Sequence, residues 1–286
     1  MIEQTIALAE RDGYALSHLY AFREAWYRRL GWEVCGRRFR VSCPTSKLPT
    51  FKGGLEPREI EGEHKWKQVQ HVYASFASRY SGMNLRKPSQ WRTVVEGSKK
   101  QARLYAVGEP AEAYCVVHVS TDFWGEQHIS ETAWASGAGY EGLISLFAAI
   151  GANRSAISWY EPSDSPFLMR HVEQGAKMQL DRPIMYRVVD VPSAVAALRP
   201  EGSGEFNMCV SGEPWRVSYG AGKARAERGG RGELLLDYGQ LAQAILGEPS
   251  LQDLLAQGIV SCASSTDAEA ACRLFRPAMV YCMDFF

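Results

Sequence analysis

The same order of predicted elements occurs twice in this chain, about 140 residues apart. The first copy reads as a helix ending at Asp12-Gly13, a strand over 14–20, a helix over 22–30 closed by Gly31, and strands over 32–43 that bend at Gly36. The second copy reads as a helix over 140–150 ending at Gly151, a strand over 155–160, a helix over 166–174 ending at Gly175, and strand-like residues 178–189. The chain is therefore expected to fold as two related modules. Aligning Gly175 with Gly31 places His171 at the position of Tyr27.

The two copies differ in what precedes them. Before the second copy we expect helices over 64–80 and 88–96 and strands over 103–107, 112–120 and 127–135, whereas nothing precedes the first copy. If a complete module needs those elements to close its sheet, the first copy lacks roughly its first half. We therefore expect a truncated first lobe.

A third unit follows a cluster of helix and strand breakers at 199–204. Strands are expected over 206–210, 215–219 and 233–236, then leucine-rich helical spacing with stops at Gly247 and Gly258, a helix over 267–275 and an apolar tail over 279–286. Such a tail is poorly tolerated by water, so we expect it to dock on the protein.

Composition narrows the function classes. With 46% hydrophobic and 11% aromatic residues the chain can bury a core, and 32 basic against 32 acidic residues give no global attraction to nucleic acid or membranes. The sequence contains no apolar run of about 20 residues and no secretory signal, so we expect a cytoplasmic protein. Seven scattered cysteines and six histidines without ligand spacing predict reduced thiols and no metal site.

Three stretches together resemble a known family. Leu19–Trp32, with Tyr27-Arg-Arg-Leu-Gly-Trp32, resembles the "FYRRFGY" helix of the enhanced intracellular survival acetyltransferases, a group of the Gcn5-related N-acetyltransferase superfamily. Val188–Leu198 resembles the segment that leaves their second acetyltransferase-like domain. Gly204–Phe286 is similar to their C-terminal sterol-carrier-like domain, including an aromatic last residue. The order and spacing of these stretches carry the likeness.

The resemblance implies a duplicated acetyltransferase core in which only the first copy binds acetyl-CoA. It also implies that a sterol-carrier-like third domain closes off the acceptor pocket and that the chain assembles as a hexamer. Matched by position, Tyr27 is the general acid that protonates the departing CoA thiolate, and the terminal carboxylate of Phe286 helps to deprotonate the acceptor amine. We expect Phe22, together with Tyr27, to contact acetyl-CoA.

General chemistry is consistent with these roles. A phenol with a reference pKa of about 10 is protonated at neutral pH and can give its proton to a thiolate. A terminal carboxylate with a reference pKa of about 3.5 becomes a better base where burial raises that pKa. Each residue can also have a purely structural role. Tyr27 could be a core or rim aromatic residue of an amphipathic helix, and Phe286 could be part of a frayed chain end.

The family holds the CoA pyrophosphate on an Arg/Gly-rich loop at a helix start, whereas here that helix begins at Met1. The second copy offers Gly137-Ala-Gly139-Tyr-Glu-Gly142, which could cradle phosphates or, with Glu161 about 20 residues on, match a dinucleotide fingerprint. Two features argue against the dinucleotide interpretation. The preceding segment, with His128, Ser130, Glu131 and Thr132, is too polar for a buried central parallel strand, and the βαβ continuation is missing. We therefore expect the glycine-rich stretch to be a plain loop.

Two basic stretches are read as solvated loops, although the second could touch CoA or an anionic partner. The first contains Arg86, Lys87, Arg92, Lys99, Lys100 and Arg103, and the second contains Lys223, Arg225, Arg228 and Arg231.

The sequence thus predicts an α/β (α+β) protein with partial and complete acetyltransferase-like mixed sheets and a C-terminal sterol-carrier-like α+β domain. The expected domains are 1–45, 46–198 and 199–286. The predicted function is transfer of acetyl from acetyl-CoA to a small-molecule or protein amine, impaired by the missing half-lobe, in a homo-oligomer without nucleic-acid or membrane partners. The alternatives are an apolar-ligand-binding protein built on residues 204–286 and a non-catalytic structural protein.

Overall fold

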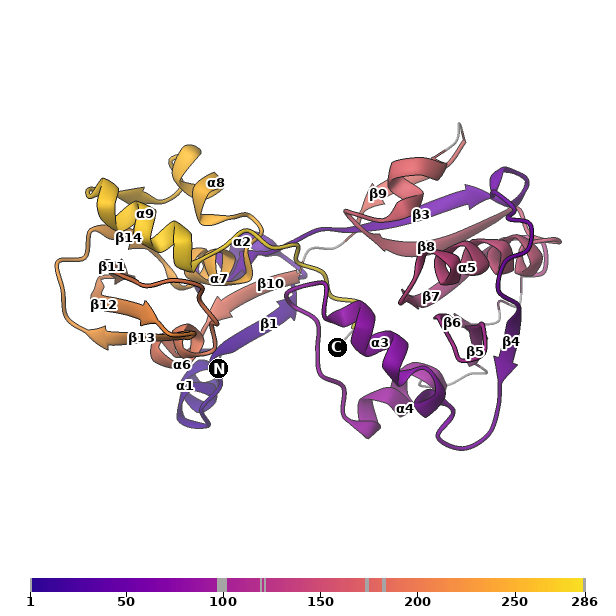
Figure 1. Cartoon of the computed structure of the whole chain (residues 1–286), viewed down its shortest axis with the longest axis horizontal. Helices are drawn as coiled ribbons and strands as arrows, with labels where there is room; N and C mark the ends of the chain where they lie inside the picture. The colour runs from indigo at the N-terminus through magenta and orange to yellow at the C-terminus, as the bar shows by residue number, and fades with distance from the viewer. Residues whose placement is uncertain are drawn as a thin grey trace. The chain divides into compact units, whose positions relative to one another are not determined.

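The computed structural model describes residues 2–96, 102–118, 120, 122–172, 175–181 and 184–284 (Figure 1). Its helices are α1 Ile2–Arg11, α2 Glu24–Arg28, α3 Gln70–Ala77, α4 Pro88–Glu96, α5 Gly137–Ile150, α6 Val191–Ala196, α7 Tyr238–Leu246, α8 Leu251–Ala256 and α9 Ser265–Leu274, with short helical turns η1 Thr45–Lys47, η2 Lys65–Gln68 and η3 Phe167–His171.

The strands within the same residues are short to medium in length. They are β1 Leu16–Tyr20, β2 Glu33–Val34, β3 Arg38–Pro44, β4 Pro57–Ile60, β5 Ala102–Val107, β6 Ala113–His118, β7 Glu126–Trp134, β8 Ala156–Pro162, β9 Lys177–Leu180, β10 Ile184–Val188, β11 Gly204–Val210, β12 Glu213–Gly220, β13 Lys223–Arg228, β14 Leu234–Leu236 and β15 Ser261–Cys262. The mixed α+β class expected from the sequence is confirmed.

The described chain forms two compact units. Unit 1 consists of 2–36 and 184–280, and unit 2 consists of the described residues between 37 and 181 together with 281–284. The chain therefore passes between the units at more than one point. The domain boundaries expected after residues 45 and 198 remain predictions.

The strands of the two sequence copies are exchanged in a reciprocal way. In unit 1, β10 from the second copy lies between β1 and β2 of the first and pairs antiparallel with both. In unit 2, β3 from the first copy lies between β8 and β9 of the second and again pairs antiparallel with both. Each copy thus donates its last strand to the sheet of the other, and this symmetry supports the internal repeat.

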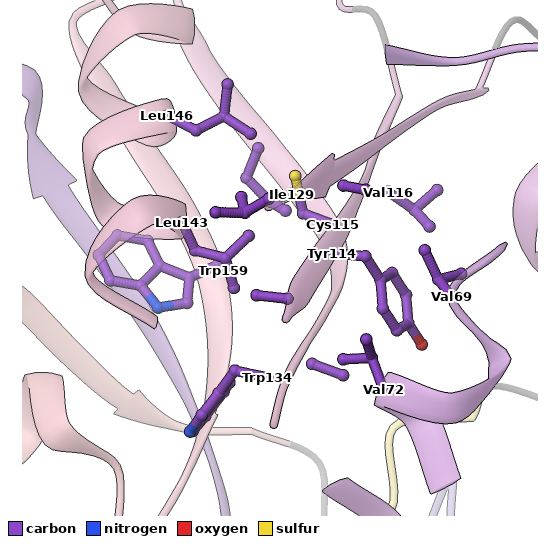
Figure 2. Close-up of a cluster of buried hydrophobic side chains, with 14 of the residues drawn as sticks. Val69, Val72, Tyr114, Cys115, Val116, Ile129, Trp134, Leu143, Leu146 and Trp159 are labelled. Atoms are coloured by element: carbon purple, nitrogen blue, oxygen red, sulfur yellow. The ribbon is translucent and has the colours of Figure 1, made fainter. Parts of the chain in front are cut away.

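Unit 2 is built on a seven-stranded sheet in the order β4-β5-β6-β7-β8-β3-β9. Helix α5 places apolar side chains such as Leu143 and Leu146 on one side of β6 (Figure 2). Val69, just before α3, and Val72, within α3, lie on the other side. Along β6, Cys115 and Tyr114 alternate between these two sides, and both are fully buried. The sheet is therefore covered on both faces in this region.

Unit 1 also contains a five-stranded sheet in the order β13-β12-β11-β14-β15, on which α9 packs at β11 and β15 and α6 packs at β13, with α8 against α9. Helix α7 begins at a capping box of Asp237 and Gln240, and α8 begins at a second one of Ser250 and Asp253, so both helix starts are encoded locally. Helix α7 also contacts β10 and β2, which joins this sheet to that of the first copy within one unit.

Candidate functional site

Tyr27 lies on α2, a short helix in the first copy that ends before Gly31. The φ angle of Gly31 is +82°, a left-handed conformation that favours glycine. The Tyr27 ring meets Phe22 with ring centroids 5.5 Å apart and Trp26 at 4.8 Å, both edge to face. Trp32 lies on its other side at 6.2 Å. The structure therefore brings together the two residues expected to contact acetyl-CoA.

A pocket of about 200 Å³ opens beside the Tyr27 ring. Its walls come from α1, β1, α2 and the residue after Gly31, and the lining residues are Ile2, Thr5, Ile6, Ala9, Ser17, Leu19, Tyr27 and Trp32. Most of this wall is apolar, with the hydroxyls of Thr5, Ser17 and Tyr27 as polar groups. The volume is below that of a drug-sized site and suits a small acyl or amine group.

The Tyr27 side chain is half-buried, and none of the described residues forms a hydrogen bond with its hydroxyl. Charges near α2 are mostly positive, since Arg23 and Arg29 are exposed and Arg28 pairs with Glu33 at 3.0 Å. Phe22 is 75% exposed, which is unusual for an aromatic side chain and leaves it open to a ligand. The described part of the first copy thus offers an aromatic wall, a phenol and flanking arginines.

Phe286, the expected source of the base, lies outside the described residues. The tail that leads to it is described as far as Asp284, and Val280, Tyr281, Cys282, Met283 and Asp284 are all buried. The expected docking of the tail is confirmed for these residues.

The glycine-rich stretch of the second copy forms the first turns of α5 rather than a plain loop. A Cβ on Gly139 would lie 2.6 Å from the Glu112 carbonyl oxygen, and one on Gly142 would lie 2.4 Å from a Val107 methyl, whereas Gly137 faces open space. Gly139 and Gly142 are therefore needed for the close packing of α5 against its neighbours within unit 2.

The start of α5 is also occupied by local groups. The Ser136 hydroxyl accepts a hydrogen bond from the Gly139 amide at 3.0 Å and donates one to the Glu112 carboxylate. The Glu112 carboxylate is stabilised by the positive N-terminal end of the helix dipole of α5, and its negative charge would repel a pyrophosphate. The residues present here do not fit the phosphates of CoA. His171, the counterpart of Tyr27, lies on η3 and packs edge to face against Phe51 at 5.4 Å.

The expectation that 127–135 is too polar for a central strand is wrong. Strand β7 lies between β6 and β8 and pairs parallel with β8, so β7, α5 and β8 form a βαβ unit. Its polar side chains are accommodated because they find partners inside the protein. Glu131 bonds Arg86 and the Tyr114 hydroxyl, and His128 Nδ1 lies 3.1 Å from the Ser158 hydroxyl.

Glu161, on β8, is a buried carboxyl group with an unusual pKa. Burial raises the pKa of this group to about 7, against hydrogen bonds from Trp159 and Tyr140 that lower it. Its second oxygen has no partner among the described residues. The group is closed off in the core of unit 2, so its titration bears on stability.

The two basic stretches differ from the expectation of solvated loops. The side chain of Arg86 is buried, and Lys99 and Lys100 lie outside the described residues. In the second stretch, Lys223 to Arg228 form β13, an edge strand of the five-stranded sheet. Alternating charges along such a strand protect an exposed edge from pairing with other chains.

The described parts of the chain contain no group of three or more His, Cys, Asp or Glu side chains placed to hold a metal ion. None of the described helices combines the length and apolarity required to span a bilayer. All seven cysteines are free thiols.

Two α/β modules that exchange strands, followed by a sheet with leucine-rich helices, define the class as a tandem acetyltransferase-like fold with an added α+β domain. Residues 203–283 match the family model of the sterol carrier protein domain. No curated protein sequence matches the chain.

Solved structures share the fold over the whole chain. A GCN5-related N-acetyltransferase from Anabaena variabilis superposes with a TM-score of 0.86 at 19% identity, covering 100% of this chain and 76% of that one. One from Kribbella flavida gives 0.80 at 21% identity, covering 100% and 74%. Eis1 from Mycobacterium abscessus gives 0.75 at 16% identity, covering 100% and 77%. The chain thus has the fold of these acetyltransferases, and the resemblance found in the sequence is confirmed at the level of fold.

Proposed function

We propose that this chain is an N-acetyltransferase that moves acetyl from acetyl-CoA to an amine on a small molecule or protein. The observation that carries the proposal is the Tyr27 hydroxyl, which lines a small pocket in the first copy and has no partner among the described residues. The acetyltransferase fold of the chain supports the same chemistry.

In the proposed reaction, the uncharged amine nitrogen attacks the thioester carbonyl carbon. A carbon–nitrogen bond forms, the carbon–sulfur bond breaks, and the electron pair of that bond leaves with sulfur. Tyr27 gives its proton to the thiolate, and the terminal carboxylate of Phe286 takes the proton that the amine loses. The phenolate and the protonated carboxyl then exchange a proton through solvent, which restores both groups.

Acetyl-CoA supplies the activated acyl group as co-substrate. The first copy supports its thioester end, since Phe22 and Tyr27 form a ring pair at the pocket and Arg23 and Arg29 add positive charge nearby. The second copy does not fit its phosphates, because Glu112 and the cap at Ser136 occupy the start of α5.

A CoA-release assay with a panel of amines tests this proposal. Tyr27→Phe should lower kcat by roughly 10²- to 10⁴-fold, the usual contribution of a positioned general acid. His171→Phe changes the counterpart residue in the second copy and should leave kcat unaltered. Removal of Phe286 should depress turnover as severely as Tyr27→Phe. Release of CoA no faster than background by the unaltered chain would refute the proposal.

The assembly and location are further parts of the proposal. By resemblance we propose a homo-oligomer, as a hexamer, in the cytoplasm. Light scattering of the purified chain reports its mass, and a monomer at micromolar concentration would contradict the first of these statements.

The rival function is binding of an apolar ligand between the five-stranded sheet and the leucine-rich helices. Phe206 and Met208 on β11, Leu241 on α7 and Leu254 on α8 are each at most 1% exposed. Their packing supports a filled core rather than a ligand cavity. Saturable displacement of a fluorescent fatty acid would favour the rival.

A further inference from the structure

Strand β9, Lys177–Leu180, is the outermost strand of the sheet of unit 2, beside β3 (Figure 1). All its residues are exposed, with Met178 at 44% and Leu180 at 57%. An exposed edge strand presents unpaired backbone donors and acceptors, which can pair with a further strand. The sheet of unit 2 can therefore be extended at β9.

The opposite edge of the same sheet is protected, whereas β9 is not. Strand β4 begins with Pro57, which has no N–H to donate. It also carries Arg58 and Glu59, and each of these side chains is in an ion pair. Charged residues and proline are the usual devices that keep an edge from pairing with other chains. Of the residues of β9, only Lys177 is charged, and none is a proline.

The backbone of β9 alternates between groups that face β3 and groups that face outward. The Asp181 amide, just after the strand, donates to the Arg38 carbonyl at 2.8 Å, and the antiparallel pairing with β3 continues through β9. Successive residues of a strand direct their backbone groups to opposite sides. The amides and carbonyls of Met178 and Leu180 therefore face away from β3, and they have no hydrogen-bond partner among the described residues.

The apolar side chains of β9 belong to an exposed apolar group. Met178 lies opposite Val41, which is fully buried, so both apolar side chains of β9 are on the core face of the sheet. The helical turn η3 packs against Trp159 on that face. It leaves Met169 74% exposed, and Val172 just after it is 46% exposed. Apolar side chains gathered at an unpaired edge indicate an interaction surface.

The strand is complementary to itself in one antiparallel register. With a two-fold axis at Gln179, Met178 of one protomer lies opposite Leu180 of its partner, and the two residues can exchange both backbone hydrogen bonds. The same register sets Lys177 opposite Asp181, so unlike charges meet at both ends of the pairing. Lys177 has no ion-pair partner in the described part of the chain. An axis at Lys177 would instead set two lysines opposite each other.

We propose that β9 is a self-association edge, at which two copies of this chain pair antiparallel about a two-fold axis at Gln179. The two sheets then form one continuous sheet, and Met178 and Leu180 contact each other across the interface. A strand of another protein would use the same backbone groups, but the match of Lys177 with Asp181 favours a second copy. This inference gives the proposed homo-oligomer an interface and does not depend on acetyl transfer.

A cysteine at the axis tests the register. In the proposed pairing, Gln179 faces its own counterpart in a non-hydrogen-bonded pair, with Cα atoms about 4.5 Å apart, which a disulfide can bridge. Two copies of residue 178 lie diagonally, about 7–8 Å apart, which is too far. Under mild oxidation Gln179→Cys should form disulfide-linked dimers, and Met178→Cys should form roughly tenfold fewer. Non-reducing gel electrophoresis measures both, and the unaltered chain, with its seven free thiols, gives the background.

A matched pair of leucine variants tests the edge. Leu180→Lys places a charge on β9 and should lower the mass of the assembly about twofold in sedimentation experiments, because losing a two-fold interface divides the assembly into halves. Leu235→Lys is the control, since Leu235 is 51% exposed but its strand β14 is paired on both sides, by β11 and β15. It should leave the mass unaltered. Urea denaturation midpoints show that both variants are folded.

Two results would overturn the inference while leaving the homo-oligomer in place. One is an assembly mass that Leu180→Lys does not change, and the other is cross-linking of Gln179→Cys no more efficient than that of Met178→Cys. A monomeric unaltered chain would overturn both the interface and the homo-oligomer. Failure of acetyl transfer is separate, because it appears as absence of CoA release.

Discussion

The two sequence copies form the same elements but bury them differently. In the second copy, α5 places seven residues in the core of unit 2, and β8 lies inside a seven-stranded sheet. In the first copy, α1 has no buried residue, β1 is half-buried throughout its length, and a pocket opens between them. One module has its interior filled, whereas the other presents apolar and aromatic side chains to a possible ligand.

This difference supports the proposal that the chemistry belongs to the first copy. The second copy keeps the glycine-rich helix start and a βαβ unit, yet it uses glycine for packing and places a carboxylate at the helix start. The first copy keeps the phenol and the open pocket. The proposal thus assigns stability to the second copy and the site to the first copy, and four predictions test this division.

The largest expected difference in the free energy of unfolding is between the loss of a buried arginine and the loss of an exposed one. Arg86→Met in unit 2 should lower the free energy of unfolding by about 3–5 kcal/mol, because the desolvated carboxylates of Glu131 and Asp284 lose their cation. Arg28→Met removes the first copy's pair with Glu33, in which Arg28 is 47% exposed, and should cost at most about 1 kcal/mol. Urea denaturation measures both. Similar losses for the two variants would contradict the division.

The matching helices differ in packing. Leu143 on α5 is 1% exposed, so Leu143→Ala should lower the free energy of unfolding by about 2–5 kcal/mol. Ile6→Ala changes a half-exposed residue of α1 that lines the pocket, and it should cost about 1 kcal/mol or less. A larger loss for Ile6→Ala in thermal unfolding would show that the first copy also has a tight core.

The core of the second copy should depend on pH. Burial raises the pKa of Glu161 to about 7 in the folded chain, above the ordinary value of 4.5. The folded state then binds more protons than the unfolded state between these values, so stability falls as pH rises from about 4.5 to 7. The loss should be on the order of 3 kcal/mol.

Glu161→Gln should remove this fall, since glutamine cannot ionise. Burial lowers the pKa of His128 to about 4, assisted by Arg40, and this residue acts in the opposite direction, with stability lost as pH falls from about 6.5 to 4. Unfolding curves for the chain and for Glu161→Gln at pH 5 and pH 8 separate the two residues. Parallel pH dependence in the two proteins would contradict the role given to Glu161.

The smallest effect concerns the start of α5. Gly139→Ala gains helix propensity but forces a methyl group against the Glu112 carbonyl, for a net loss of about 1 kcal/mol. Gly137→Ala meets open space and should be neutral or slightly stabilising. Equal stability of the two variants would remove the packing explanation for these glycines.

Local patterns allowed most elements and the repeat to be predicted. Some signals act over only a few positions and can be recognised from the sequence. They include the helix-ending glycines Gly13 and Gly31 and the capping residues of α7 and α8. Strand β13 was missed because its alternating charged and alanine residues resemble a loop. The burial of Arg86 could not be predicted, because its partner Asp284 lies 198 residues away.

The candidate site was predicted in part and by resemblance. Tyr27 and Phe22 lie only five residues apart, within α2 and just before it, so their ring contact is local, whereas the pocket needs α1 and β1 in their folded positions. The polar strand β7 was misjudged, since the pairing of Glu131 and His128 with distant residues cannot be read from the strand alone.

Hydrogen exchange in the presence of acetyl-CoA tests most directly the claim that the first copy holds the site. The account predicts slower exchange at amides of β1 and α2, over residues 16–28, and no change over residues 136–142 at the start of α5. Protection over 136–142 without protection over 16–28 would contradict it.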